Sequence, residues 1–380
     1  MKPRILIFSL AYLPHVGGAE VALKEITDRI SDLEFHILTL NFGGELKNEK
    51  IGNVFVHRIG NGSSYISKIL FIPRAARYAL RLHKEQSFDA YWAMMSYMLF
   101  PIVLLRFMNV RVPYLLTLQE GDPWQRMFSR WFILPFRSLL SIGFKNASQV
   151  QVISTYLGQW ATRMGFGGEV SVVPNGVDLT RFTNATHPSF VTAGTVNLIT
   201  ASRLVHKNAL DEVIRALVLL PKNVQFVIYG SGPDESMLQK LSEKLAVSER
   251  VLFKGYSPHT ELARAFSTAH IFIRPSRSEG MGNSFIEAMA AGLPVIGTQE
   301  GGIADFLFDE KRNPGKPTTG WAVDVDSPQQ IALAVKDIMT NPEKVARVRT
   351  NGLALVREKY DWNLIAHDMK KLFDRVLGSA

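Results

Sequence analysis

The run "SRSEGMGNSFIEAMAAGLPVIG", Ser276–Gly297, holds two glutamates eight positions apart, Glu279 and Glu287. The apolar run just before it, "HIFIRP", is typical of a buried strand. Glycines and small residues then lead into an Ala-rich stretch, which predicts a helix beginning near Asn283 or Ser284. The stretch therefore predicts a strand, a loop with Glu279, and a helix with Glu287 about one turn inside it.

The same alternation extends along the whole chain. In the first half, the apolar runs predict strands and the segments between them predict helices at residues 19–31, 66–85, 97–108, 125–143 and 155–164. A polar stretch at 180–195 is predicted to be a linker, and the alternation of predicted strands and helices resumes after it. Since 380 residues are too many for one ordinary core, we predict an α/β protein of two domains with parallel sheets, residues 1–182 and 183–360. Asp361 is placed to cap a last helix that begins at Trp362.

Composition narrows the class of protein. The chain is 47% apolar and 20% charged, which is typical of folded proteins, and it contains no apolar run long enough for a membrane-spanning helix. Its first apolar run is short and reads as a strand rather than a signal peptide. The absence of cysteine excludes disulfides and thiolate metal sites. We therefore expect a cytoplasmic protein.

The positive charge is concentrated in the first half. Residues 1–185 hold 20 Lys and Arg against 13 Asp and Glu, whereas the remainder holds 23 against 21. Two segments, 67–84 and 124–145, mix apolar residues with cations and resemble helices that lie at a membrane surface; the alternative is that both simply cover the sheet. Their cations are Arg74, Arg77, Arg81 and Lys84, and Arg126, Arg130, Arg137 and Lys145. The excess of positive charge in the first half favours an anionic partner. Nucleic acid is disfavoured as that partner, because the basic segments have no pattern of aromatic residues that could stack on bases.

Loops that follow strands are the expected ligand-binding segments, with the cleft between the two domains as the default site. Gly17 and Gly18 open a helix after the first strand, and a second glycine loop, "GSG" at 230–232, has no third glycine of a dinucleotide fingerprint. Arg203 and Lys207 lie four apart before a helix, which suits a diphosphate, although the pair by itself is more typical of a solvated basic turn.

The opening stretch indicates a ligand with both anionic and hydroxyl groups. The free N–H groups of its helix N-terminus suit a phosphate, whereas carboxylates accept hydrogen bonds and suit hydroxyls. A nucleotide sugar has both, with its diphosphate between two polyols. A metal is the other way to offset a diphosphate, but the one Asp-x-Asp pair, Asp324 and Asp326, reads as structural. We predict no metal and no cofactor.

These motifs together resemble the retaining glycosyltransferases of family 4, which have the GT-B fold. The resemblance covers nearly the whole chain and rests on motifs in a fixed order: "GGAE" at 17–20, "VVPNGVD" at 172–178, "SRLVHKN" at 202–208, "GSGP" at 230–233, the Glu-x7-Glu stretch at 275–296 and "GGIAD" at 301–305. It implies two Rossmann-like domains that face a central cleft, with the last helix, about 361–380, crossing back to the first domain.

The resemblance also implies roles. Glu279, Arg203 and Lys207 would act in catalysis, with Glu279 at the donor sugar and the two cations at the diphosphate. Glu287 would hold the ribose. The other donor-binding residues would be Gly17, Gly18, Gly230, Gly232, Gly280, Met281, Gly282 and Asn283. The family usually has a wider spacing between the two cations, so this loop is one residue tighter.

A further departure concerns the acceptor side. Many family members have His-Asp or His-Gly after the fifth strand predicted in the first half, where this chain has Gln119 and Glu120. Gln119 cannot act as a general base, and Glu120 or Asp122 remains as the candidate on the acceptor side.

The predicted activity is retaining, metal-independent transfer of a hexose-type sugar from a nucleoside-diphosphate sugar to a hydroxyl. The acceptor would be a saccharide or a lipid-linked saccharide in bacterial cell-surface polysaccharide, lipopolysaccharide or glycolipid synthesis, with peripheral contact to anionic membrane at the inner face of the cytoplasmic membrane. The alternatives are a GT-B-like nucleotide-sugar epimerase and a non-catalytic nucleotide-sugar-binding protein.

Overall fold

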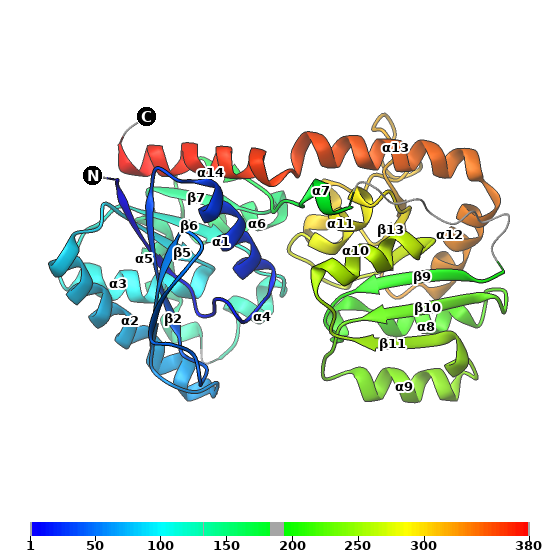
Figure 1. Cartoon of the computed structure of the whole chain (residues 1–380), viewed down its shortest axis with the longest axis horizontal. Coiled ribbons are helices and arrows are strands. Elements are labelled where there is room, and N and C mark those ends of the chain that lie inside the picture. The colour runs from blue at the N-terminus through cyan, green and yellow to red at the C-terminus, as the bar shows by residue number, and fades with distance from the viewer. Residues whose placement is uncertain (1, 132, 183–193, 379–380) are drawn as a thin grey trace. The chain divides into compact units, whose positions relative to one another are not determined.

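The computed structural model describes residues 2–131, 133–182 and 194–378. The chain forms two compact units (Figure 1). Unit 1 contains the residues up to Asn175 together with those from Trp362 onward, and unit 2 is Gly176–Asp361. Most of the predicted linker at 180–195 lies outside the described residues. Each unit is an α/β sandwich with its own sheet and core.

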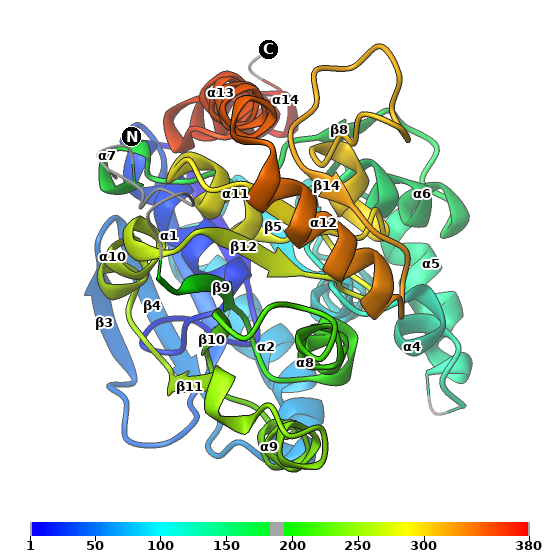
Figure 2. The ribbon, with the colours of Figure 1, turned by 90° about the vertical axis from the view of Figure 1, so that its right-hand side faces the viewer.

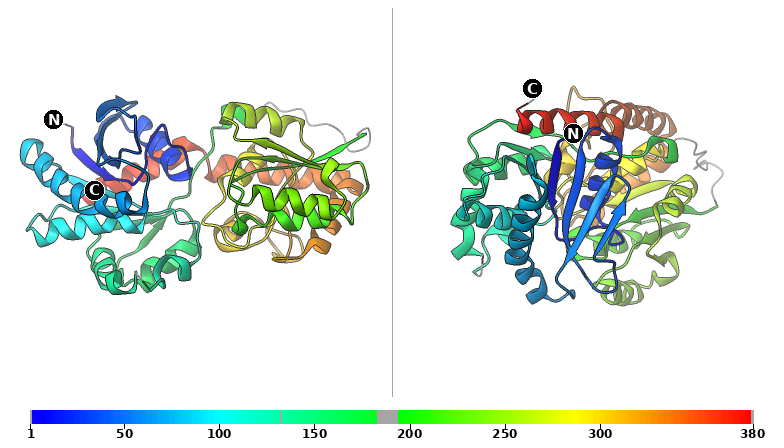
Figure 3. Two further views of the ribbon diagram at one scale, coloured as in Figure 1. Left: turned by 90° about the horizontal axis from the view of Figure 1, so that it is seen from below. Right: turned by 60° about the vertical axis from the view of Figure 1, so that its left-hand side comes forward.

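Unit 1 is built on an eight-stranded sheet in the order β3-β4-β2-β1-β5-β6-β7-β8. The first strands of this sheet, in blue, lie side by side in the right-hand view of Figure 3. All neighbouring strands are parallel except the edge pair β3 and β4. The strands are β1 (Arg4–Phe8), β2 (Glu34–Leu40), β3 (Asn48–Ile51), β4 (Val54–Ile59), β5 (Ala90–Met94), β6 (Tyr114–Leu118), β7 (Gln149–Val152) and β8 (Val170–Val172). The central strands read as continuous apolar runs because helices cover both faces of the sheet.

The helices of unit 1 are α1 (Gly18–Arg29), α2 (Tyr65–Gln86), α3 (Leu99–Phe107), α4 (Trp124–Phe128), α5 (Arg137–Lys145), α6 (Thr155–Arg163) and α14 (Trp362–Leu377). The last helix begins at Trp362, as predicted, and packs beside α1 (Figure 1). Its Phe373 ring meets Phe35 and Trp92 edge-on, at centroid distances of 5.8 and 5.0 Å. The end of the chain therefore completes the core of the first sheet.

One helix prediction in unit 1 is wrong. The segment 125–143 is not a single helix, because α4 ends at Phe128 and α5 begins only at Arg137. Pro135 lies in the first turn of the intervening 3₁₀ helix, Leu134–Phe136. Proline lacks the N–H that a helix interior needs, so it is tolerated at the start of a helix and interrupts it elsewhere. The segment therefore cannot be one continuous amphipathic helix.

Unit 2 has a six-stranded parallel sheet in the order β11-β10-β9-β12-β13-β14. The strands are β9 (Val196–Ala201), β10 (Val224–Tyr229), β11 (Val251–Gly255), β12 (Ile271–Arg274), β13 (Val295–Gly297) and β14 (Trp321–Ala322). The helices are α7 (Leu179–Phe182), α8 (Leu210–Leu217), α9 (Glu235–Lys244), α10 (His259–Thr268), α11 (Asn283–Ala290), α12 (Pro328–Thr340) and α13 (Pro342–Lys359). Helix α8 packs against both α9 and α12 (Figure 2), and α11 packs against α13.

The strand orders locate one switch point in each sheet. Strand succession reverses between β1 and β5 in unit 1, and between β9 and β12 in unit 2. Loops after the two strands at such a point diverge to opposite faces of the sheet and leave a crevice at its carboxyl edge, where open α/β sheets bind ligands. In unit 2 these two loops carry Arg203 and Lys207 after β9, and Glu279 after β12.

Candidate active site

Glu279 is held from two sides at the carboxyl edge of the unit 2 sheet. Arg274, the last residue of β12, donates from Nη2 to Glu279 Oε2 at 2.9 Å, and the Gly280 amide donates to Oε1 at 3.0 Å. The Arg274 guanidinium is buried and also donates to Ser284 Oγ at 3.0 Å. Since a carboxylate has about four acceptor positions, each oxygen retains capacity for a hydroxyl donor.

The loop after Glu279 needs glycine where it turns into α11. Gly282 caps the helix with φ +97°, and a Cβ there would lie 2.9 Å from the buried Arg274 guanidinium. Helix α11 begins at Asn283, as predicted, so its N-terminus lies at the same edge of the sheet. Met281 is buried, at 2% exposed. Glu287 is 9% exposed, on the second turn of α11.

The loop after β9 presents a cation to solvent. The Arg203 side chain is exposed and makes no ion pair or hydrogen bond with the residues that the structure describes. Asn208, which is buried, donates from Nδ2 to the Arg203 carbonyl at 2.6 Å and fixes the backbone of the loop. Lys207 is half-buried in the 3₁₀ turn that leads to α8. The backbone is thus rigid while the Arg203 side chain stays available.

The glycines of the "GSG" loop support this backbone. A Cβ at Gly230, where φ is +126°, would lie 1.9 Å from the Ser202 carbonyl oxygen. A Cβ at Gly232 would lie 2.2 Å from the Leu204 carbonyl oxygen. Both glycines are therefore required because two backbones pack together. Their predicted contact with the donor stays a prediction.

Arg277 ties the two loops together, and sequence reasoning missed it. Its amide donates to the Lys207 carbonyl and its Nη1 to the His206 carbonyl, both at 2.7 Å. Its guanidinium binds both oxygens of Asp211 at 2.9 Å and donates from Nε to Asp326 at 2.6 Å. Burial alone would raise the pKa of Asp211, but the Arg277 hydrogen bonds and charge outweigh it and hold that pKa below its ordinary value.

No spacing rule marks Arg277 in the sequence, because its partners are 66 and 49 positions away. Asp326 is one member of the Asp-x-Asp pair, and the other, Asp324, pairs with Arg312 at 2.8 Å. Both carboxylates therefore serve ion pairs within unit 2, in agreement with the structural role predicted for them.

The loop after β13 completes this edge of the sheet. Gly301 has φ +62°, and a Cβ there would lie 1.9 Å from the Glu279 carbonyl oxygen. The next amide, that of Gly302, donates to the same carbonyl at 3.1 Å. The backbone of Glu279 is therefore fixed by a neighbouring loop, while its side chain is fixed by Arg274.

In unit 1, the N-terminus of α1 already holds a carboxylate. Gly17 is the N-cap, Gly18 the first helical residue, and Glu20 folds back so that a Cβ at Gly17 would lie 2.7 Å from its Oε2. Burial raises the pKa of Glu20, while hydrogen bonds from its own amide and that of Gly17 oppose the shift. In a capping box, the carboxylate of the third helical residue accepts a hydrogen bond from the N-cap amide, and Glu20 makes this contact with Gly17. The role predicted for both glycines at the donor phosphate remains to be tested.

The three acceptor-side candidates lie in different surroundings. The amides of Gln119 and Asn175 exchange hydrogen bonds at 3.1 and 3.2 Å. Asp122 lies 3.5 Å from Arg126 and is half-buried. Glu120 is 1% exposed; one oxygen accepts from the Ser96 amide at 2.6 Å, and the other has no hydrogen-bond partner among the described residues. Burial raises the pKa of Glu120, although hydrogen bonds from Ser96 oppose the shift.

Two family models match the chain in tandem. The model described as glycosyltransferase family 4 matches residues 16–181, and the one described as glycosyl transferases group 1 matches residues 191–354. The chain belongs to the family 4-like glycosyltransferases. The family predicted from the motifs is therefore confirmed.

Curated relatives include lipid-directed glycosyltransferases. The GDP-mannose-dependent alpha-(1-6)-phosphatidylinositol monomannoside mannosyltransferase of Mycolicibacterium smegmatis is 29% identical over 61% of this chain and 64% of its own. A phosphatidylinositol N-acetylglucosaminyltransferase subunit of Arabidopsis thaliana is also 29% identical, over 55% of this chain and 44% of its own. The matches thus span less than two thirds of these relatives. An uncharacterized glycosyltransferase of Methanocaldococcus jannaschii aligns over 96% of both chains at 21% identity.

Solved structures share the fold at low sequence identity. Sucrose-phosphate synthase from Thermosynechococcus elongatus has a TM-score of 0.84 at 18% identity, covering 100% of both chains. The Anabaena protein HepE, solved with UDP-glucose, has a TM-score of 0.77 at 17% identity, covering 98% of this chain and 99% of its own. The fold of this glycosyltransferase is GT-B, as predicted, with two Rossmann-like units.

Proposed function

We propose that this glycosyltransferase moves a hexose-type sugar from a nucleoside-diphosphate sugar to an acceptor hydroxyl, with retention of anomeric configuration and without a metal. One observation carries the donor class. At the switch point of unit 2, Arg277 joins the loop of the exposed Arg203 to the loop of Glu279, whose carboxylate is oriented by Arg274. Cations next to an oriented carboxylate suit a ligand that has both a diphosphate and hydroxyls.

Each group then has a role in the reaction. Arg203, Lys207 and the amides at the N-terminus of α11 stabilise the diphosphate as negative charge develops on it. Glu279 accepts hydrogen bonds from sugar hydroxyls near the reacting carbon, and Glu287 accepts them from the ribose. Because the cations offset the charge of the leaving group, the proposal needs no metal. The acceptor hydroxyl attacks from the face that the diphosphate leaves, so configuration is retained.

The acceptor that we propose is a lipid-linked saccharide or glycolipid of the bacterial cell surface. The printed names of two relatives, a monomannoside mannosyltransferase and an N-acetylglucosaminyltransferase subunit, both refer to phosphatidylinositol. The basic first half of the chain would place the enzyme against the inner face of the cytoplasmic membrane. Glu120 is our candidate on the acceptor side, since its second oxygen has no hydrogen-bond partner among the described residues.

Purified protein should be incubated with a panel of UDP-, GDP- and ADP-sugars and a lipid-linked acceptor, and nucleoside diphosphate release measured. We expect release with one donor class, an α-linked product from an α-linked donor by NMR, and an unchanged rate in EDTA. An inverted product would contradict retention, and loss of activity in EDTA would contradict metal independence. Binding of a donor without diphosphate release under any condition would favour the non-catalytic alternative.

A further inference from the structure

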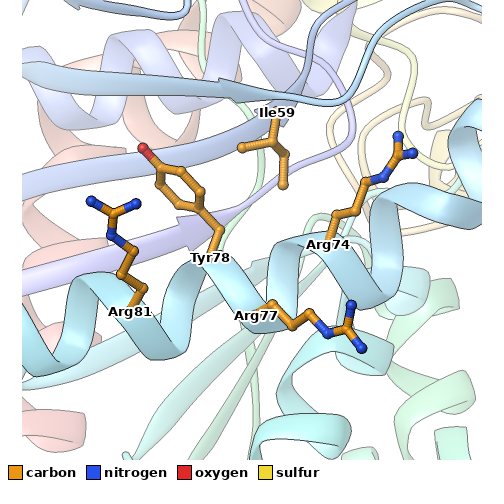
Figure 4. A pocket seen from close by; sticks show the side chains of 5 residues that line it. All are labelled: Ile59, Arg74, Arg77, Tyr78 and Arg81. Carbon is orange, nitrogen blue, oxygen red and sulfur yellow. The ribbon is translucent and has the colours of Figure 1, made fainter.

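Arg58 is a buried cation of unit 1 to which the proposed reaction gives no role. It lies on β4, is 5% exposed, and follows Val54 and Val56 on the face of the sheet whose core includes α1. The next residue, Ile59, points to the opposite face, where it borders a hollow beside Tyr78 of α2 (Figure 4). Helix α2, which like every described helix is not long and apolar enough to span a membrane, covers this second face, in agreement with one of the two roles predicted for it. Arg58 is therefore a guanidinium at the end of an apolar row, where an unpaired charge would be strongly unfavourable.

The Arg58 guanidinium joins two loops at the carboxyl edge of the sheet. Its Nη2 donates to the Leu13 carbonyl, in the loop after β1, at 2.6 Å. Its Nη1 donates to the Leu46 carbonyl, in the loop after β2, at 2.9 Å and also pairs with Glu49 of β3. The Arg58 amide donates to the Lys47 carbonyl at 2.7 Å. Because a guanidinium holds its donors in a fixed fork, this contact, the Arg58 link, sets the distance between the two loops.

A second contact, the His15–Glu45 link, joins the same two loops. His15 Nε2 lies 2.8 Å from Glu45 Oε1, and the His15 ring packs against the Phe42 ring with centroids 4.5 Å apart. The other oxygen of Glu45 accepts from the Gly43 amide at 2.8 Å. Desolvation would raise the pKa of Glu45, but hydrogen bonds from His15 and the Gly43 amide outweigh it and hold that pKa below its ordinary value. Glu45 is therefore ionised at neutral pH, and His15 Nε2 donates to it.

Both links act on a segment that has little burial of its own. Residues 14–18 are all exposed, and they lead directly into α1, whose N-cap is Gly17. Glycine has wide conformational freedom, so the position of this N-terminus depends on contacts from outside the segment. The Arg58 link holds the chain at Leu13, just before the segment, and the second link holds it at His15, inside the segment.

We propose that the two links are positioning contacts, which hold Gly17 and Gly18 in the conformation that receives the donor diphosphate. A loop that is already fixed binds a ligand with a smaller loss of conformational entropy. The arrangement parallels that of unit 2, where Arg277 joins the loops after β9 and β12. The inference rests on the proposed function, and in particular on the role predicted for the two glycines.

A double-mutant cycle on the His15–Glu45 link tests this in the full-length protein. His15→Ala and Glu45→Ala should each raise the donor KM about tenfold, because either change releases the segment before Gly17. The double variant should raise it no further, since both changes break the same contact. The KM for a water-soluble acceptor should stay parental in all three. His15→Gln, whose side-chain amide retains a donor for Glu45, should recover the parental donor KM. Nucleoside diphosphate release measures each value.

Arg58→Lys tests the buried link. Lysine keeps the charge but lacks the fork that reaches both carbonyls, so the donor KM should rise at least as much as in His15→Ala. Urea unfolding establishes that the variant is folded. Asp368→Ala, which breaks an exposed ion pair with Lys371 on α14, is the control and should have the parental donor KM.

Three results would overturn the proposal. The first is a parental donor KM in His15→Ala and in folded Arg58→Lys. The second is an additive effect of the two substitutions in the cycle, because His15 and Glu45 would then act separately. The third is a donor KM in His15→Gln as high as in His15→Ala, because the imidazole would then have a role other than its hydrogen bond to Glu45.

A binding measurement separates this proposal from the proposed function. Calorimetry with the UDP-, GDP- and ADP-sugars of the panel gives the donor dissociation constant without turnover. A constant that rises about tenfold in His15→Ala, in a protein that releases no nucleoside diphosphate, would support the positioning contacts and contradict the proposed function. Parental turnover and parental donor affinity in every variant would do the reverse.

Discussion

In unit 2, Arg203 is exposed at the carboxyl edge of the sheet, whereas in unit 1 the carboxylate at the corresponding edge, Glu120, is 1% exposed. The unit 2 edge is fixed by backbone packing and by Arg274 and Arg277, which leaves functional groups directed outward. At the unit 1 edge, polar groups are paired with one another or buried, and the Gln119–Asn175 amide pair is an example. The unit 2 edge thus presents a cation to solvent, whereas the unit 1 edge keeps its carboxylate out of solvent, and we propose the former as the donor site and the latter as the acceptor side.

The comparison would be contradicted most clearly if the two cations of the loop after β9 had no role. Arg203→Ala and Lys207→Ala should each lower kcat by about 10² to 10³-fold, the range typical when a preorganised group that stabilises developing charge is removed. Nucleoside diphosphate release under saturating donor measures the effect. Lys240→Ala, another exposed cation of unit 2, is the control and should retain full activity. Unchanged turnover in the Arg203 and Lys207 variants would place the diphosphate elsewhere.

A second test concerns the rigidity of the unit 2 edge. Gly301→Ala would force a Cβ to within 1.9 Å of the Glu279 carbonyl oxygen, at φ +62°. We expect the free energy of unfolding to fall by about 3 kcal/mol and activity to fall with it. Gly315→Ala has comparable backbone strain at φ +86° but no atom within 4 Å, and should cost only about 1 kcal/mol. Urea unfolding compares the two, and equal losses would show that the contact with Glu279 is unimportant.

Arg277 tests whether the two loops must be joined. Arg277→Met removes the partner of Asp211 and the side-chain donor to the His206 carbonyl, so we expect a loss of about 3 kcal/mol in unfolding free energy and a roughly tenfold higher donor KM. Asp326→Asn removes only an exposed ion pair and should cost less than about 1 kcal/mol. A lower stability with unchanged donor KM would make Arg277 structural, and recovery of KM in Arg277→Lys would support its positioning role.

Glu120 offers the smallest and most specific test. Because burial raises its pKa in the folded protein, the neutral form stabilises the fold. This stability is present below the ordinary carboxyl pKa and is lost as the pH rises through the raised value. Glu120→Gln, which retains an acceptor for the Ser96 amide, should remove this pH dependence and gain about 1 kcal/mol at neutral pH.

Urea unfolding of Glu120→Gln and the parent protein from acid to neutral pH measures this difference. Asp122→Asn, at the half-buried neighbouring carboxylate, is the comparison variant and should retain the parental pH dependence. An identical pH dependence in Glu120→Gln and the parent would mean that burial does not raise the pKa of Glu120, and the contrast between the two edges would then disappear.

Local patterns predicted much of the candidate site in unit 2. The start of α11 at Asn283 and the placement of Glu279 in the loop before it follow from a strand signal, glycines and an Ala-rich run, all within one short segment. The break at Pro135 was also readable, since proline in a helix interior is a local steric fact, but the amphipathic pattern on either side of it obscured the signal. Short edge strands such as β14, with two residues, have too few positions for a period to be recognised.

The sequence by itself determined the class of fold, the order of its strands along the chain and the motifs that mark a family 4-like glycosyltransferase. These depend on hydrophobic period and on glycines at turns, which are properties of neighbouring residues. Only the tertiary structure showed that Arg277 joins the Lys207 and Glu279 loops, that Glu120 is buried, and that Arg74 and Arg77 have no ion pair or hydrogen bond among the described residues. Ion pairing and burial depend on residues that are far apart in the chain. These residues come into contact only when the chain folds, so a single sequence does not show which of them are partners.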